Sequence, residues 1–281
     1  MAKVYTPEQL KGFWRMHRPS DFDPSRIWPA EQWFIDQLMF ADGKINAVFG
    51  LPKAGKSRFL LWCLASVFSG RTALGLPVKA VPERVIWLLG EEEEKYPQWR
   101  LTRYAQLLGA DPTGWPITFV RAAAMGLDQL SNRQIFVDQY LLQYKPDLLV
   151  IDPLRRVHNL QESSNDQMPI LLNDFRRWVQ TLKSSNGRSL SMAIVHHTGK
   201  PREGEILDNI VSWSRGATDF PAIVDAAMFL QDSGWSDVAN GRRVDVLRAG
   251  RLPVSSPISL IDQGAADKSN PAMTDLGWRR E

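Results

Sequence analysis

One eight-residue segment, Gly50–Ser57, has the spacing G-x-x-x-x-G-K-[ST] and can bind phosphate. Glycines let such a loop turn tightly, so that its backbone N–H groups point at phosphate oxygens. Lys56 supplies positive charge for the β- and γ-phosphates of ATP, and the Ser57 hydroxyl is a hard oxygen ligand for Mg²⁺. The residues predicted to contact the nucleotide are Gly50, Lys53, Ala54, Gly55, Lys56, Ser57 and Arg58.

The segments on either side of this loop favour phosphate binding over the alternative, a chance glycine-rich turn. Residues 45–49 are apolar except for Asn46 and predict a short strand, and residues 57–69 predict a buried helix. A helix that begins directly after the loop directs its positive N-terminus at the phosphates.

A second apolar strand, 148–151, ends in the carboxylate of Asp152. In a phosphate-loop protein this carboxylate usually reaches the Mg²⁺ ion, directly or through water. We therefore predict that Ser57 and Asp152 hold the metal. The alternative is that Asp152 caps the segment that follows it.

A catalytic base cannot directly follow Asp152, because the next residue is Pro153. The run Glu91–Glu94 follows another apolar strand, 84–89, and Glu91 comes first after the turn at Gly90. A carboxylate in that place can orient and deprotonate a water molecule that attacks the γ-phosphate. The alternative is that the whole run is an acidic helix start that favours the positive end of the helix dipole.

A further apolar strand, 191–195, ends in His196 and His197. The chain has four His and one Cys, which is too few ligands for a convincing zinc site. A histidine that senses the γ-phosphate by a hydrogen bond fits better. Three arginines near the ends of later elements could serve as an arginine finger in a neighbouring subunit, or could be ordinary surface residues: Arg215, Arg248 and Arg251.

The elements that must position these groups alternate along the chain. Predicted strands at 45–49, 84–89, 117–120, 148–151 and 191–195 are separated by predicted helices near 57–69, 97–108, 131–143 and 169–183. This pattern predicts an α/β fold whose mostly parallel sheet has helices on both faces. Apolar runs at 226–230 and 243–247 flank a turn-rich segment, 232–241, and predict an antiparallel C-terminal edge.

The ends of the chain differ from its body. Residues 1–30 predict an arm with a short helix and proline-rich turns, either docked on a neighbouring subunit or loosely packed. We predict that residues 31–263 form the ATPase domain and that the polar tail 264–281 is flexible.

Composition sets further bounds on the class of protein. The chain has 281 residues, 44% of them hydrophobic, and a net charge of only +3. This charge allows a local basic patch without by itself indicating nucleic acid. Cys63 is predicted to be a buried small hydrophobe, and no segment resembles a signal peptide or a membrane span. We therefore expect a cytoplasmic protein without a membrane partner.

Together these motifs resemble the RecA-like phosphate-loop ATPases, with the best match in the branch that contains the plasmid hexameric replicative helicase RepA. The likeness runs from about residue 28 to residue 260 and is most specific at 195–200 and at 214–217. It implies a RecA-like fold, with Glu91 activating water, His197 sensing the γ-phosphate and Arg215 reaching a neighbour's nucleotide. Arg248 lies where this family often has a basic residue at the same interface, although that residue is more often Lys.

The resemblance also implies that two loops present basic residues to DNA in a central channel. Their side chains would bind backbone phosphates without reading sequence, and they are Arg155, Arg156, Lys200 and Arg202. The alternative is that both are ordinary solvated loops.

Three functions follow from these predictions. The first is a homohexameric ring that hydrolyses ATP, moves on single-stranded DNA and unwinds duplex during replication. The second is an ATP-gated DNA-binding protein that acts in recombination, repair or loading without unwinding. A small-molecule kinase is a third class, but such kinases need an acceptor-binding lid that is usually arginine-rich, and the interval from Asp152 to His197 looks instead like loop, helix and strand.

Overall fold

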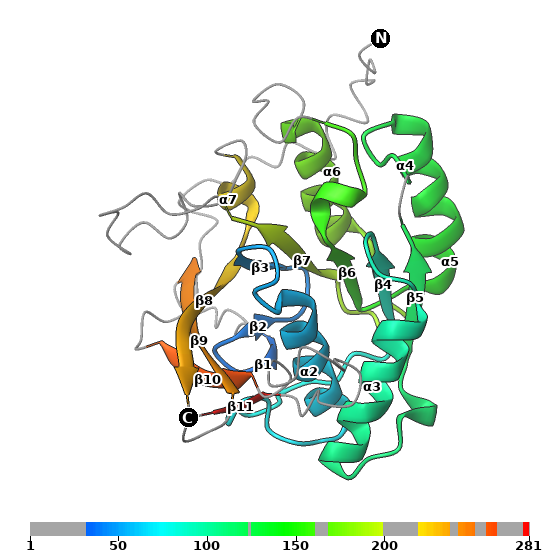
Figure 1. Cartoon of the computed structure of the whole chain (residues 1–281). Helices are drawn as coiled ribbons and strands as arrows, with labels where there is room; N and C mark the ends of the chain where they lie inside the picture. Colours follow the sequence, from blue (N-terminus) through cyan, green and yellow to red (C-terminus); the bar gives the residue numbers. More distant parts are fainter. Residues whose placement is uncertain are drawn as a thin grey trace, which may run out of the picture. The chain divides into compact units, whose positions relative to one another are not determined.

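The structure is built on one large twisted sheet (Figure 1). The computed structural model describes residues 32–122, 125–160, 168–198, 219–236, 241–250, 257–262 and 278–280. Within these residues the order of strands across the sheet is β11 (Trp278–Arg280), β10 (Ile258–Asp262), β9 (Gly241–Gly250), β8 (Ala226–Ser236), β3 (Ile45–Gly50), β7 (Ser191–His197), β6 (Leu148–Asp152), β4 (Val85–Leu89) and β5 (Ile117–Arg121).

Six neighbouring strands, from β8 to β5 across the sheet, are parallel. Strands β3, β4 and β6 are buried along their whole length, which explains their continuous apolar sequences. All five strands predicted for the body of the sheet are present. The prediction of a mostly parallel sheet is therefore confirmed.

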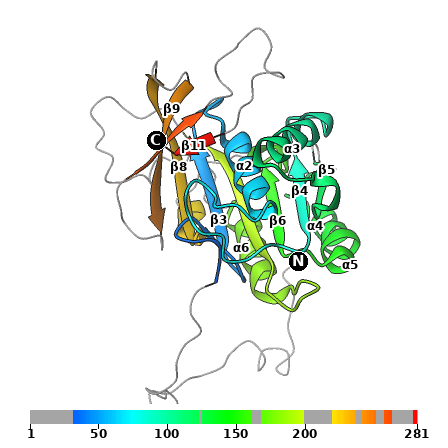
Figure 2. The same cartoon turned by 90° about the horizontal axis from the view of Figure 1, so that it is seen from below.

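Helices cover both faces of the sheet (Figures 1 and 2). One face carries α2 (Lys56–Phe68) and α3 (Lys95–Leu108), which share a core with that side of the strands. The other face carries α4 (Leu130–Phe136), α6 (Met168–Thr181) and α7 (Asp219–Ile223). A π-helical segment, η3 (Val137–Leu141), joins α4 to the short α5 (Leu142–Tyr144). Short 3₁₀ turns complete the set, at η2 (Pro112–Gly114) and η4 (Leu154–Arg156).

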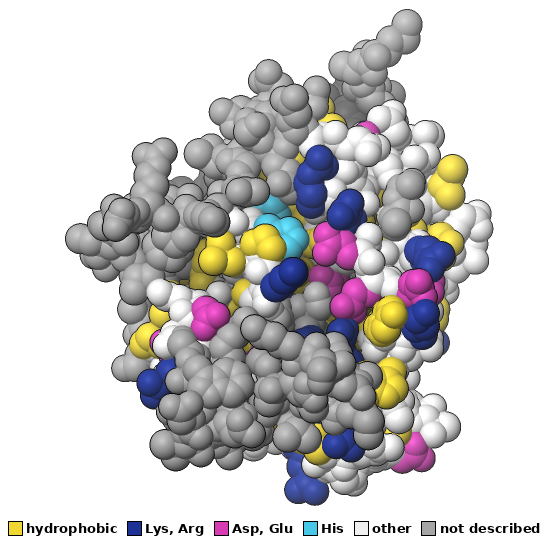
Figure 3. Space-filling model, viewed as in Figure 1, with side chains coloured by type: hydrophobic (Ala, Val, Ile, Leu, Met, Phe, Trp, Pro, Cys, Tyr) yellow, Lys and Arg dark blue, Asp and Glu magenta, His cyan; other side chains and the backbone are white. Residues whose placement is uncertain are grey.

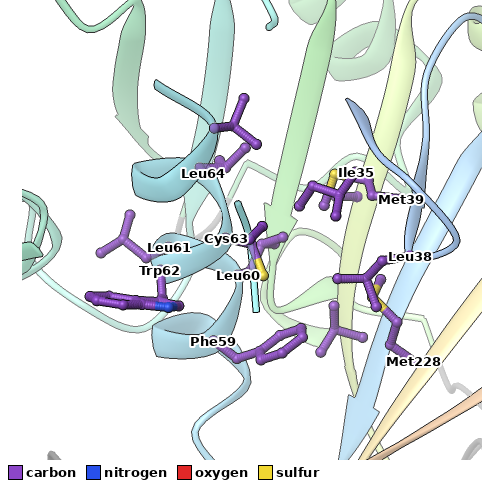
Figure 4. Packing of buried hydrophobic residues seen from close by; sticks show 14 of the residues in the cluster. Ile35, Leu38, Met39, Phe59, Leu60, Leu61, Trp62, Cys63, Leu64 and Met228 are labelled. Atoms are coloured by element: carbon purple, nitrogen blue, oxygen red, sulfur yellow. The ribbon is translucent and has the colours of Figure 1, made fainter. Parts of the chain in front are cut away.

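The helix after the phosphate loop is buried on most of its surface, as its apolar sequence predicts. Figure 4 shows Phe59 and Cys63 on the side of α2 that faces Leu38 and Met228. Cys63 is fully buried, and burial raises the pKa of its thiol far above the usual range. The prediction that Cys63 is a core residue rather than a reactive thiol is confirmed.

The C-terminal edge is antiparallel, as predicted, but larger than the sequence indicates. Strand β8 pairs antiparallel with β9, β9 with β10, and β10 with β11. Residues 232–236, predicted to lie in a turn-rich segment, belong to β8, so this strand is longer than predicted.

The prediction of a flexible tail over 264–281 is wrong for residues 278–280. These residues form β11 because Trp278 is buried and the segment hydrogen-bonds to β10. Residues 263–277 lie outside the described part of the chain, as does the predicted arm, 1–30.

A small hairpin, β1 (Trp33–Ile35) and β2 (Met39–Phe40), was not predicted. The buried side chain of Asn46 attaches it to the sheet, with hydrogen bonds to both the N–H and the carbonyl of Phe40. Among the described helices, none is both long and apolar enough to cross a membrane.

The α/β fold with a mostly parallel sheet, helices on both faces and an antiparallel C-terminal edge is therefore confirmed, and it is consistent with a RecA-like phosphate-loop NTPase. This fold places the carboxyl ends of β3, β7, β6 and β4 along one edge of the sheet.

Candidate functional site

The predicted site residues on the core strands meet at this one edge of the sheet. Gly50, at the end of β3, pairs directly with His197, at the end of β7. Asp152, at the end of β6, pairs with Leu89, and Glu91 follows Leu89 by two residues. Figure 3 shows histidine, acidic and basic side chains gathered in the middle of the molecular face that it draws.

Ser57 and Asp152 touch, which brings together the two predicted metal ligands. Ser57 Oγ donates a hydrogen bond of 2.9 Å to Asp152 Oδ1. Burial raises the pKa of the Asp152 carboxyl to about 7, the Ser57 hydroxyl opposes this rise, and the charge of Glu92 adds to it. A carboxylate and a hydroxyl are hard oxygen ligands, so the pair fits Mg²⁺.

Two such ligands are too few to hold Mg²⁺ without help. Within the described residues there is no group of three or more His, Cys, Asp or Glu side chains that could hold a metal ion. Mg²⁺ in proteins is often bound by one or two carboxylates together with substrate phosphates. The arrangement therefore suits a metal that arrives with a nucleotide.

Lys56 is buried and its ammonium group reaches three acceptors. Its Nζ donates to the carbonyl oxygens of Gly50 at 2.9 Å and Leu51 at 2.8 Å, and it lies 3.1 Å from Nδ1 of His197. Burial lowers the pKa of Lys56 to about 8, while the charges of Asp152 and Glu91 act to raise it. The lysine therefore remains mostly protonated at neutral pH and links the loop to β7.

Glu91 lies near these residues and is paired with Arg156. Glu91 Oε1 lies 3.0 Å from Nε of Arg156, which belongs to the 3₁₀ turn η4 after Asp152. The chain at Gly90 lies so close to η4 that a Cβ atom at Gly90 would collide with Cβ of Arg156. The absence of a side chain at Gly90 therefore allows η4 to lie beside Glu91.

The other three glutamates of the run each have a different cationic partner. Glu92 pairs with Arg100 at 2.6 Å, Glu93 with Lys95 at 2.6 Å, and Glu94 with Arg121 at 3.5 Å. Helix α3 begins only at Lys95, so Glu91 is not in its first turn. Glu91 and Glu92 both line the cavity that contains Lys56, Ser57 and Asp152.

Two adjoining cavities flank the loop. One, of about 260 Å³, is lined by the polar residues just described, together with Lys53, Gly55, Arg58 and His197. The other, of about 350 Å³, lies between Gly50–Ala54 and the middle of β8, with Phe229, Leu230 and Leu247 in its wall. The sequence did not reveal this second, more apolar cavity, because its walls come from segments far apart along the chain.

Two predicted arginines make contacts that the sequence did not reveal. Arg58 lines the polar cavity, but its guanidinium group binds the buried carboxylate of Asp262, at 2.8 and 3.1 Å. Arg248 Nη1 donates to the carbonyl oxygen of Gln37, at 3.3 Å, and burial lowers its pKa, with Arg280 adding to the effect. Arg248 lines neither of the two cavities within its own chain.

The remaining predicted residues divide into two groups. Arg155 and Arg156 are exposed on η4, which is anchored by the buried side chains of Leu154 and Val157. The others lie outside the described residues, namely Lys200, Arg202, Arg215 and Arg251.

Comparison with known protein families identifies the kind of domain in which this site lies. A family model described as an AAA domain matches residues 15–203, which include the loop, Glu91, Asp152 and His197. A search of curated proteins gives no match.

Proposed function

The chain belongs to the AAA domain family, whose members are ATPases, and we propose that it is a ring-forming motor that hydrolyses ATP and moves on single-stranded DNA. In its finer form the proposal is a homohexameric DNA helicase of replication, related to the plasmid helicases that include RepA. The hydrogen bond between Ser57 and Asp152 and the contact between Lys56 and His197 support the ATPase part.

The two cavities suit the two halves of ATP. In the proposed complex the phosphates lie in the polar cavity, against the backbone N–H groups of the loop and the N-terminus of α2. The adenine ring enters the apolar cavity beside Phe229 and Leu247. When bound, Mg²⁺ would neutralise charge on the β- and γ-phosphates, with Ser57 and Asp152 as its protein ligands.

Hydrolysis then needs a base and charge stabilisation. Glu91 takes a proton from water as the water oxygen bonds to the γ-phosphorus and the bridging P–O bond to ADP breaks. Lys56 stabilises charge on the phosphoryl oxygens, and His197, at the end of β7, senses the γ-phosphate through a hydrogen bond. The products are ADP and phosphate.

One observation carries the DNA part of the proposal, the ion pair between Glu91 and Arg156. Arg156 is an exposed cation on the loop proposed to bind DNA phosphates, and it already touches the proposed base. A DNA phosphate that draws Arg156 away would free Glu91 to act on water. DNA binding and hydrolysis would then be coupled through one side chain.

Hydrolysis in a ring also requires groups from the neighbouring subunit. We propose that Arg215, Arg248 or Arg251 reaches the next subunit's nucleotide, and that residues 1–30 help to hold subunits together. Mixing Lys56→Ala chains with Arg215→Ala chains tests the first candidate. Activity recovered at mixed interfaces supports a trans arginine at 215, and no recovery at any mixing ratio contradicts it.

The function as a whole is tested by measuring ATP hydrolysis with and without single-stranded DNA, together with molecular mass by light scattering. We expect DNA to stimulate hydrolysis in an assembly of several subunits. No stimulation by DNA or RNA would contradict the proposal. Open helical filaments seen by electron microscopy, in place of closed rings, would favour the ATP-gated DNA-binding protein.

A further inference from the structure

The C-terminal strand packs on the phosphate loop, although the two are more than 200 residues apart in the sequence. In the ladder between β10 and β11, Asp262 pairs with Trp278, so both side chains point to the same face of the sheet. That face is the one covered by α2. Trp278 is only 2% exposed, and its ring meets the ring of Phe59 edge-on, with centroids 5.7 Å apart.

Trp278 lies directly against Gly55, the residue before Lys56. A Cβ atom at Gly55 would be 3.0 Å from Cζ2 of Trp278, so the indole ring fills the space beside this glycine. Gly55 has φ +86° and is the N-cap of α2, so its conformation sets where the loop ends and the helix begins. The indole N–H has no acceptor among the described residues, so the contacts of the ring within this part of the chain are packing contacts.

Asp262 holds the first turn of the same helix. Its two carboxylate oxygens accept hydrogen bonds from Nη1 and Nη2 of Arg58, at 3.1 and 2.8 Å. Asp262 is 1% exposed, so this two-point contact is shielded from solvent. A bidentate pair fixes orientation as well as distance. Trp278 and Asp262 therefore restrain α2 on both sides of Lys56 and Ser57.

We infer that Trp278 and Asp262 are positioning residues for the phosphate loop, and that nucleotide affinity depends on the C-terminal strand. The inference rests on the proposed binding of nucleotide by this loop. A loop that is ordered before binding loses less conformational entropy when phosphate arrives. Loss of the restraint at Gly55 should therefore weaken binding even though Trp278 itself lines neither of the two cavities beside the loop.

The test is the Kd for MgADP, measured by calorimetry well below the unfolding midpoint of every variant. Trp278→Ala should raise Kd by about tenfold or more, and Trp278→Phe, which keeps an aromatic ring on Gly55, should restore most of the affinity. Asp262→Asn should also raise Kd, because the neutral amide holds Arg58 less firmly. If Trp278→Ala does not fold, Asp262→Asn decides the question.

The matched control is Trp178→Ala. Trp178 is equally buried, at 3% exposed, but it lies on α6 in the core of the opposite face. This variant should lose stability and keep its Kd within about twofold of the wild type. Equal loss of affinity in Trp178→Ala and Trp278→Ala would overturn the inference, as would unchanged or tighter binding in Trp278→Ala or Asp262→Asn. Failure of the wild-type protein to bind MgADP would instead contradict the proposed function itself.

Discussion

Nζ of Lys56 lies 3.1 Å from Nδ1 of His197 and joins the phosphate loop to the end of the neighbouring strand β7. The pairing of Gly50 with His197 in the sheet makes this contact possible. A group bound to Lys56 is therefore within reach of a histidine on a different strand. This gives the site a side chain that can respond to the γ-phosphate.

Replacing His197 should lower the rate of hydrolysis more than it lowers nucleotide affinity. We expect His197→Ala to reduce kcat by about 100-fold, the usual order for losing a polar group that contacts the reacting phosphate. His197→Asn, which keeps a polar side chain, should recover part of the rate. The measurement is steady-state ATPase activity, with kcat and KM determined separately.

His196 is the control for this prediction. It is buried on the opposite side of the strand, against Phe49 and Phe220. His196→Asn should lower the unfolding temperature and leave kcat close to that of the folded wild-type protein. If His196→Asn lowers kcat as much as His197→Ala does, the assigned role of His197 is wrong.

Glu91 and Glu92 should differ sharply although they are neighbours that line the same cavity. Glu91→Gln removes the proposed base and should reduce kcat by about 10²- to 10⁴-fold, with nucleotide still bound. Glu92→Gln weakens the ion pair with Arg100 on α3 and should change kcat only a few-fold. Single-turnover hydrolysis compares the two variants. A larger loss of rate in Glu92→Gln than in Glu91→Gln would identify Glu92 as the base instead.

Asp152 should make the nucleotide-free protein less stable as pH rises. Its pKa of about 7 in the folded protein lies above the ordinary value of 3.8, so the folded state binds the proton more tightly than the unfolded state. The resulting stabilisation is complete below pH 4 and is lost as pH rises through 7, by about 4 kcal/mol in total. Urea unfolding of the wild type and of Asp152→Asn, without Mg²⁺, measures this difference.

We expect the difference in free energy of unfolding between the wild type and Asp152→Asn to widen from pH 4 to 7 and then to stay constant, with Asp152→Asn the more stable protein. Ser57→Ala serves as the control. It keeps the carboxyl but removes the hydrogen bond that lowers the pKa of Asp152, so its stability should continue to fall to a higher pH. Parallel pH profiles for the wild type and Asp152→Asn would contradict the assignment.

Local sequence patterns predicted most of the parallel sheet and the residues that end its strands. The apolar runs before Gly50, Glu91, Asp152 and His197 are long enough to identify buried strands, and parallel strands bring their carboxyl ends to one edge. The glutamate run was harder, because the four side chains are identical and only the position of Glu91 directly after Gly90 separates it from the others. Their different partners, Arg156 for Glu91 and Arg100 for Glu92, become visible only in three dimensions.

The C-terminal strands were missed for a different reason. β11 has three residues, too few to show a period of two, and its flanking sequence is polar. Its place depends on pairing with β10 and on packing of Trp278 against Phe59. The contact between Arg58 and Asp262 could not be predicted either, because the two residues are 204 positions apart in the sequence. Contacts over such distances leave no trace in local patterns.

The central claim, that DNA controls ATP hydrolysis through the pair formed by Arg156 and Glu91, is tested most directly by kcat at saturating single-stranded DNA. We predict strong stimulation by saturating DNA in the wild type. Arg156→Ala, in which Glu91 has lost this ion pair, should hydrolyse ATP rapidly without DNA and should not be stimulated further by it. In Arg155→Ala, whose arginine contacts the carbonyl oxygen of His158 and not Glu91, more DNA should be needed but full stimulation should be reached. Full stimulation of Arg156→Ala would contradict the account.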